Sequence, residues 1–102
     1  MTKLIKDGKV AVLYSPGFGA GWFTWNATMP ELIFEPAIAQ FVLDKKFDEL
    51  QTYVALKYPE IYKGGMMELE VAWLPEGSEF KINEYDGAES VEVKDDIGWL
   101  TA

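Results

Sequence analysis

The chain passes abruptly from an apolar segment into a loop of alternating glycines. Residues 9–14 (KVAVLY) are mostly apolar and lie between two turn-forming segments, so they predict a buried strand. The glycines that follow are Gly17, Gly19 and Gly21, and the aromatic run WFTWN comes directly after them. Glycine is used where the backbone takes a positive φ or approaches another group closely. Any fold of this chain must therefore place a wide, sharply turning loop with two tryptophans at the end of one strand.

Two helices are predicted after this loop. Pro36 suits the first position of a helix, because proline lacks an N–H and has a fixed φ. The apolar spacing in residues 37–46 and again in residues 48–57 is helical, and Pro59 ends the second helix.

Strands are predicted for the remainder of the chain. Apolar and polar residues alternate around residues 69–73, 80–84 and 91–93. The order of elements predicts an α+β fold, with a mostly antiparallel sheet of about four strands and two helices inserted after the first strand. We expect a single domain over all 102 residues, with Trp99 and Leu100 packing back onto its core.

Three residue types with reactive or strongly binding side chains are absent. The chain has no cysteine, no histidine and no arginine, so all nine basic residues are lysines. It therefore lacks a thiol nucleophile, an imidazole base and the usual transition-metal ligands. It also lacks the guanidinium fork that suits phosphate. We expect no metal site and no cofactor, and we favour non-enzymatic binding over catalysis, with a carboxylate-based hydrolase as the alternative.

The charge balance narrows the choice of partners. A net charge of −8 at pH 7 repels polyanions, which argues against general nucleic-acid binding. No apolar run approaches the roughly 18 residues of a membrane span. The first eight residues, MTKLIKDG, lack the apolar core of a signal peptide. We therefore expect a cytoplasmic protein without a membrane partner.

The glycine–aromatic loop has two interpretations. It matches neither a P-loop, because no Gly-Lys-Ser/Thr follows, nor a dinucleotide fingerprint, because the glycine spacing differs. It is either a structural loop that packs its tryptophans under the sheet, or one wall of a ligand pocket. In the second case the backbone amides would meet an anion and the rings would stack on a base. The candidate residues are Ser15, Gly17, Gly19, Gly21, Trp22, Trp25 and Asn26.

A second candidate wall surrounds a hairpin signal. The dipeptide Asp86-Gly87 is typical of a tight two-residue turn, and carboxylates and a phenol lie around it. Carboxylates can bind ribose hydroxyls, amines or hard metals. The alternative is that the dipeptide only makes the turn and the glutamates are solvated. The candidate residues here are Lys81, Glu84, Tyr85, Asp86 and Glu89.

Both motifs resemble those of a group of small phage-encoded proteins of unassigned role. The first is SPGFGAGWFTWN at residues 15–26, followed by LIFEP at residues 32–36, and the second is EFKINEYDGAES at residues 79–90. The resemblance covers most of the chain, from Val10 to Val93. In size and setting such proteins resemble phage anti-defence proteins, some of which are sponges for cyclic nucleotide or ADP-ribose signals. Such sponges commonly use arginine, so here the amides of the glycine loop and Lys81 would have to hold the phosphate.

Two functions follow from these motifs as hypotheses. The first is a non-enzymatic, homo-oligomeric sponge that holds a small nucleotide-like ligand between the glycine loop and the hairpin. Trp22 or Trp25 would then stack on the base, and the carboxylates would bind ribose hydroxyls. The alternative is an inhibitor that blocks a host defence or host-takeover protein through an acidic surface bearing aromatic residues. A phage-encoded protein of either kind would act in the host cell cytoplasm.

Overall fold

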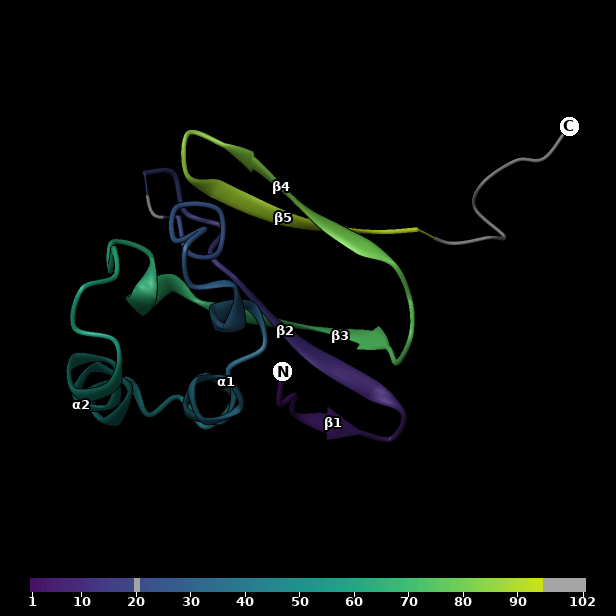
Figure 1. Ribbon diagram of the computed structural model, residues 1–102, viewed down its shortest axis with the longest axis horizontal. Helices are drawn as coiled ribbons and strands as arrows, with labels where there is room; N and C mark the ends of the chain where they lie inside the picture. The colour runs from purple at the N-terminus through teal and green to yellow at the C-terminus, as the bar shows by residue number, and fades with distance from the viewer. Residues whose placement is uncertain (20, 95–102) are drawn as a thin grey trace, which may run out of the picture.

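The protein is a three-layered α+β structure (Figure 1). The computed structural model describes residues 1–19 and 21–94. The strands are β1 (Ile5–Lys6), β2 (Lys9–Tyr14), β3 (Glu70–Pro75), β4 (Phe80–Tyr85) and β5 (Ala88–Val93). The helices are α1 (Pro36–Leu43) and α2 (Phe47–Lys57), with the short 3-10 helices η1 (Pro30–Ile33) and η2 (Met66–Glu68). Trp99 and Leu100, for which we predicted packing onto the core, lie outside the described residues.

Strand β2 lies at the centre of the fold. It pairs antiparallel with β1 on one edge and with β3 on the other, giving the sheet order β1-β2-β3. Ala11 and Leu13 face the helices, whereas Val12 faces the β4–β5 hairpin. A strand that is covered on both faces reads as a continuous apolar run, which is the pattern of residues 9–14.

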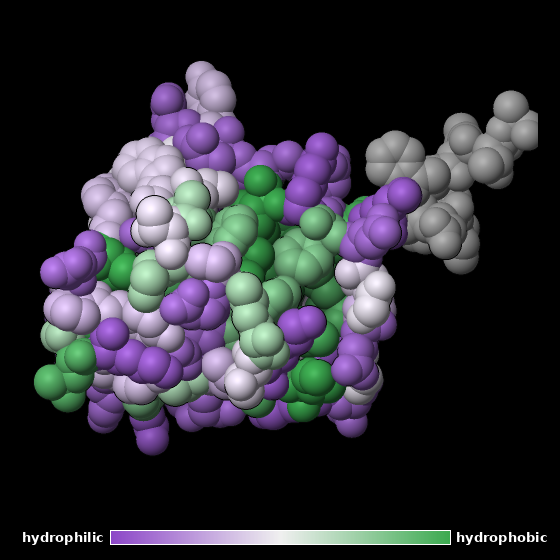
Figure 2. Space-filling model, in the orientation of Figure 1, coloured by the Kyte–Doolittle hydropathy of each residue, from purple (hydrophilic) through white to green (hydrophobic). Residues whose placement is uncertain are grey.

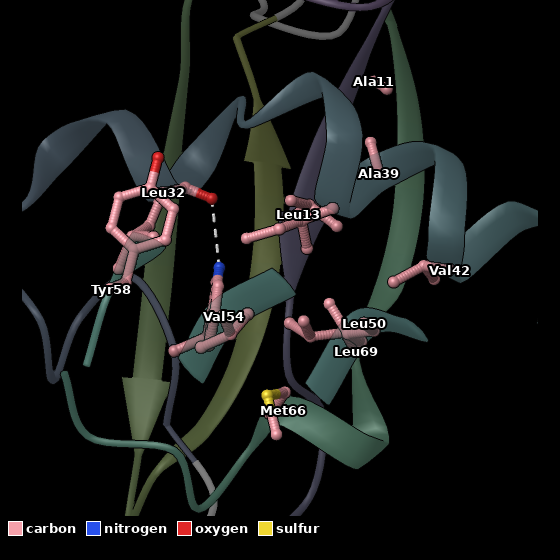
Figure 3. Packing of buried hydrophobic residues seen from close by; sticks show 12 residues of the cluster. Ala11, Leu13, Leu32, Ala39, Val42, Leu50, Val54, Tyr58, Met66 and Leu69 are labelled. Carbon is pink, nitrogen blue, oxygen red and sulfur yellow. Dashed lines mark hydrogen bonds between the residues drawn. The ribbon is translucent and has the colours of Figure 1, made fainter. Parts of the chain in front are cut away.

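The main core lies between the helices and the three-stranded sheet. Leu13, Leu50 and Val54 are fully buried there, and the other residues labelled in Figure 3 belong to the same buried cluster. Helix α1 begins where predicted, because the Glu35 carboxylate accepts a hydrogen bond from the Ala37 N–H at 3.1 Å and caps the first turn.

The five strands form two sheets, whereas we predicted one sheet of about four strands. Strands β4 and β5 pair only with each other within the described residues, around a two-residue turn in which Asp86 has φ 48° and Gly87 has φ 86°. Strand β3 pairs with all of β2 on one edge and β1 pairs with Lys9 and Val10 on the other, and the hairpin extends the sheet on neither side. It instead packs across the sheet, with Ile82 and Val91 against Val12.

The α+β class and the antiparallel pairing are confirmed. None of the helices in the described part of the chain is long and apolar enough to cross a bilayer.

Replacement of Leu13 by alanine tests the position of the core. Leu13 is fully buried, so Leu13→Ala should lower the free energy of unfolding by about 3 kcal/mol. Leu56 is 81% exposed, so Leu56→Ala should change it by less than about 0.5 kcal/mol. Urea unfolding followed by circular dichroism measures both values. Equal effects of the two substitutions would contradict this core.

Candidate functional site

The glycine loop lies directly against the turn of the β4–β5 hairpin (Figure 1). The Gly19 N–H donates a hydrogen bond to the Asp86 carbonyl, and the Gly21 N–H donates one of 2.8 Å to the Gly87 carbonyl. The structure thus brings together the two segments that the sequence singled out. The amides of Gly19 and Gly21 point at the hairpin backbone and already have acceptors there.

A buried carboxylate fixes this junction. Glu89 is only 3% exposed and stands on β5, beside the end of β2. Its Oε1 accepts a hydrogen bond from the Ser15 N–H at 2.9 Å. Its Oε2 accepts two from Thr24, one from the N–H at 2.7 Å and one from the hydroxyl at 2.6 Å. The Glu89 N–H in turn donates to the Ser15 carbonyl at 2.8 Å. One side chain therefore joins β2, the glycine loop and the hairpin, and we call this arrangement the Glu89 clasp.

Trp22 and Asn26, two further candidate ligand-binding residues, are buried like Ser15 and Glu89. Trp22 is fully buried, and its Nε1 donates to the Leu32 carbonyl at 3.0 Å. Asn26 is buried; its amide donates to the carbonyls of Trp22 and Tyr62, and its Oδ1 accepts from the Tyr62 N–H at 2.8 Å. Neither ring face of Trp22 is open to a base, and Asn26 joins the loop to the segment after α2.

Trp25 lies at the surface, over a glycine that the loop requires. Gly21 has φ 58°, and a Cβ at this position would collide with the Trp25 ring. Trp25 is 41% exposed and packs against Tyr62 with ring centroids 5.0 Å apart. The Tyr62 hydroxyl donates to the Gly19 carbonyl at 2.8 Å. The ring pair thus covers the loop backbone and keeps part of each ring at the surface.

A second pair of aromatic rings stands out further. Phe18 is 76% exposed and Tyr85 is 72% exposed, and their rings meet edge to face with centroids 6.2 Å apart. We call Phe18, Tyr85, Trp25 and Tyr62 together the aromatic tip.

Three acidic residues adjoin the segments that carry Phe18 and Tyr85. Glu84 and Asp86 flank Tyr85 in the sequence, and both are exposed. The exposed Glu68 carboxylate lies against the Gly17 backbone, one residue from Phe18. The Glu84 carboxylate accepts a hydrogen bond from the Gly87 N–H at 2.7 Å, which holds it at the turn. The segments that carry the two rings are therefore bordered by acidic residues.

The candidate residues divide by location. Ser15, Gly19, Gly21, Asp86 and Glu89 meet at the junction. Lys81 lies nearer the other end of the hairpin, where its ammonium pairs with Glu92 at 3.0 Å. Ligand binding by these residues stays a prediction.

A cluster around Glu35 was missed in the sequence analysis. Glu35 is 5% exposed; its Oε1 accepts from the Tyr53 hydroxyl at 3.1 Å, and its Oε2 accepts from the Lys57 ammonium at 3.1 Å and from the Tyr58 hydroxyl. An open hollow of about 710 Å³ borders Glu35, Lys57 and Tyr58. The only sequence signal was the spacing of Tyr53, Lys57 and Tyr58, which places all three near the end of one helix.

The pKa values of Glu35, Lys57 and Tyr58 are all shifted away from neutral pH. Burial alone would raise the pKa of Glu35, but the hydrogen bonds from Tyr58, Lys57 and the Ala37 N–H outweigh it and lower the pKa below its usual range. Burial and the bond to Glu35 raise the pKa of Tyr58 to about 12. The hydrogen bonds with Tyr53 and Glu35 raise the pKa of Lys57. At neutral pH none of these groups is ready to exchange a proton, so the cluster suits the attachment of α1 to α2 better than acid–base catalysis.

Comparison with known proteins gives no assignment, since no protein-family model, no curated protein and no solved structure matches the chain. Within residues 1–19 and 21–94, no group of three or more acidic side chains is placed to hold a metal ion. The inference of function therefore rests on the geometry of the junction and the aromatic tip.

Substitution of Glu89 tests the clasp. Glu89→Gln keeps the shape of the side chain but turns an NH₂ group toward backbone or hydroxyl donors, so the free energy of unfolding should fall by about 2 kcal/mol. Glu92→Gln on the same strand removes only an exposed ion pair and should cost less than about 1 kcal/mol. Chemical denaturation of both variants measures the difference. A Glu89 variant as stable as the wild type would show that the clasp is not structural.

The Glu35 cluster predicts a specific acid sensitivity. Because the folded-state pKa of Glu35 is lowered, its stabilising contribution is complete above the unfolded-state pKa and is lost as the pH falls through the folded-state pKa. Unfolding free energies measured between about pH 6 and pH 3 should fall less steeply in Glu35→Gln than in the wild type. Glu76→Gln, at an exposed position, should keep the wild-type slope. The same slope in all three proteins would contradict this role.

Proposed function

We propose that the protein is a non-catalytic binding protein that uses its aromatic tip to bind a basic surface of another protein. The observation that supports this most strongly is the exposed Phe18–Tyr85 pair on a loop and a turn that are bonded to each other. Large aromatic side chains dominate the energy of many protein interfaces, and few are left this exposed without a partner.

Hydrogen bonds hold the two segments that carry the Phe18–Tyr85 pair against each other. Phe18 is followed by Gly19, whose N–H donates a hydrogen bond to the Asp86 carbonyl. Tyr85 comes directly before Asp86 on the hairpin. The Glu89 clasp joins the two ends of the glycine loop, at Ser15 and Thr24, to the hairpin. A surface that is already in its bound conformation loses little conformational entropy on association.

The chemistry of the tip favours a cationic partner. Guanidinium and ammonium groups are attracted to the faces of aromatic rings. Glu84 and Asp86 flank Tyr85 in the sequence and the Glu68 carboxylate lies against the Gly17 backbone, so a cation bound at the Phe18–Tyr85 pair would have acidic residues near it. The net charge of −8 would also steer a basic protein toward this one. The resemblance to phage-encoded proteins makes a host protein the expected partner.

The small-ligand hypothesis is less well supported by the same geometry. It requires free amides at the glycine loop and a free ring at Trp22, but Gly19 and Gly21 donate to the hairpin and Trp22 is fully buried. Only the exposed rings of the tip, such as Trp25, could still stack on a base. Nucleotide binding is therefore the competing outcome of the experiment below.

A defined cationic probe tests the proposal. Titration calorimetry with tetra-arginine should show binding that the double substitution Phe18→Ala, Tyr85→Ala weakens at least about tenfold. Both side chains are largely exposed, so this variant should keep its fold by circular dichroism. Leu56→Ala, which removes an exposed apolar side chain on α2, is the matched control and should bind as the wild type does.

Three results would contradict the proposal. The first is no binding of tetra-arginine below about 1 mM. The second is equal affinity in the tip variant and the control. The third is tighter binding of ADP-ribose or a cyclic dinucleotide than of tetra-arginine, which would favour the nucleotide-like ligand instead.

A further inference from the structure

One edge of strand β4 is paired with β5, and no strand of residues 1–19 and 21–94 pairs with the other edge. A two-residue turn joins Tyr85 to Ala88, and the Lys94 N–H donates to the Glu79 carbonyl at 2.9 Å at the other end of the hairpin. In an antiparallel ladder, alternate residues turn their backbone groups toward the partner strand. The odd-numbered residues of β4 therefore bond to β5. The N–H and C=O groups of Phe80, Ile82 and Glu84 point the other way, where the described residues supply no strand.

An apolar groove accompanies this edge. A hollow of about 280 Å³ lies beside Phe80 and Ile82, with Phe23, Ile33 and Phe34 among its other lining residues. Phe80 meets Phe34 edge to face, with ring centroids 6.0 Å apart. Figure 2 shows apolar side chains gathered in the middle of this face, where the hairpin crosses the sheet. An unpaired strand beside exposed apolar surface is well suited to strand addition.

We propose that β4 pairs antiparallel with β4 of a second copy of this chain, about a two-fold axis at Ile82. The product is a continuous four-stranded sheet in the order β5-β4-β4-β5. The interface ends at Glu84, next to Tyr85 of the aromatic tip, but it is built from the backbone edge of β4 and does not rest on the function proposed above.

The free backbone groups select the register. A two-fold axis perpendicular to the sheet keeps the inward faces of both hairpins on the same side, so even-numbered residues pair with even-numbered ones. With the axis at Ile82, that residue faces its own copy and Phe80 faces Glu84, so every free N–H and C=O of these three residues is paired. An axis at Lys81 or Asn83 leaves one of the three without a partner in the other β4 strand.

The charges fit the same register. On the outward face Lys81 lies opposite Asn83 of the second copy, and no like charges are opposed. An axis at Lys81 would instead place two lysines opposite each other, and an axis at Glu84 would oppose two glutamates. Like charges directly opposite each other on neighbouring strands are destabilising. A charge introduced at Asn83 would therefore lie opposite Lys81 of the second copy. Whether it weakens or strengthens the dimer can be predicted from its sign.

Opposite charge substitutions at Asn83 test the dimer. Asn83→Lys sets two lysine–lysine pairs across the axis and should weaken the dimer roughly fivefold, whereas Asn83→Glu sets two lysine–glutamate pairs and should strengthen it by a similar factor. Sedimentation equilibrium measures the dissociation constants. Asn83 is exposed, so both variants should remain folded.

Matched controls lie one strand away from the axis. Ser90 pairs with Asn83 across the hairpin and is exposed, so Ser90→Lys and Ser90→Glu make the same charge changes further from the second copy. They should shift the dissociation constant much less than the Asn83 pair. A protein that stays monomeric up to about 1 mM would overturn the proposal. So would Asn83 variants that shift the constant in the same direction, or Ser90 variants with effects as large.

Discussion

The buried carboxylate of Glu89 is the interaction on which the arrangement of the other parts depends. It stands where the end of β2, the glycine loop and the hairpin meet, and it accepts hydrogen bonds from Ser15 and from Thr24. A buried carboxylate is costly unless it is fully hydrogen-bonded, so it strongly selects the loop conformation that supplies the donors. In that conformation Gly19 and Gly21 reach the hairpin carbonyls, and Phe18 is placed beside Tyr85.

A second buried carboxylate, that of Glu35, is hydrogen-bonded in a similar way on the other side of the three-stranded sheet. Glu35 is buried at the start of α1 and is satisfied by a backbone N–H, two tyrosine hydroxyls and one lysine. The chain has no arginine and no histidine, so Glu89 is satisfied by backbone and hydroxyl donors, and Glu35 by such donors and one lysine ammonium. Glu35 joins α1 to α2, and Glu89 joins the loop to the hairpin. Between these two anchors, β2 is covered on both faces by apolar packing.

Local patterns in the sequence predicted most of the elements but not their arrangement. The run KVAVLY, the proline at the start of α1 and the Asp86-Gly87 turn each encode their own geometry, and the structure has β2, α1 and the hairpin at these positions. The division into two sheets depends on which edges of β2 are free, and the short strand β1 that occupies one of them gave no clear signal. The burial of Trp22 rather than Trp25 is decided by long-range packing, because an irregular loop has no fixed side-chain period.

The position of Glu89 in the sequence did carry a signal. It shares the inward phase of β5 with Val91 and Val93, so a carboxylate falls where an apolar residue is expected. Such a residue in a half-buried strand indicates a polar junction inside the protein, and here that junction is the base of the aromatic tip.

Native-state hydrogen exchange at the glycine amides, followed by NMR, tests the central claim most directly. If the loop is bonded to the hairpin, the amides of Gly19 and Gly21 should exchange slowly, at rates close to that of the Glu89 amide, while Gly77 in an exposed turn exchanges quickly. In Glu89→Gln the protection of both loop amides should fall while that of Val12 in β2 falls less. Exchange of Gly19 and Gly21 as fast as that of Gly77 in the wild type would mean that the loop amides are free, and would contradict the bonded junction on which the aromatic tip depends.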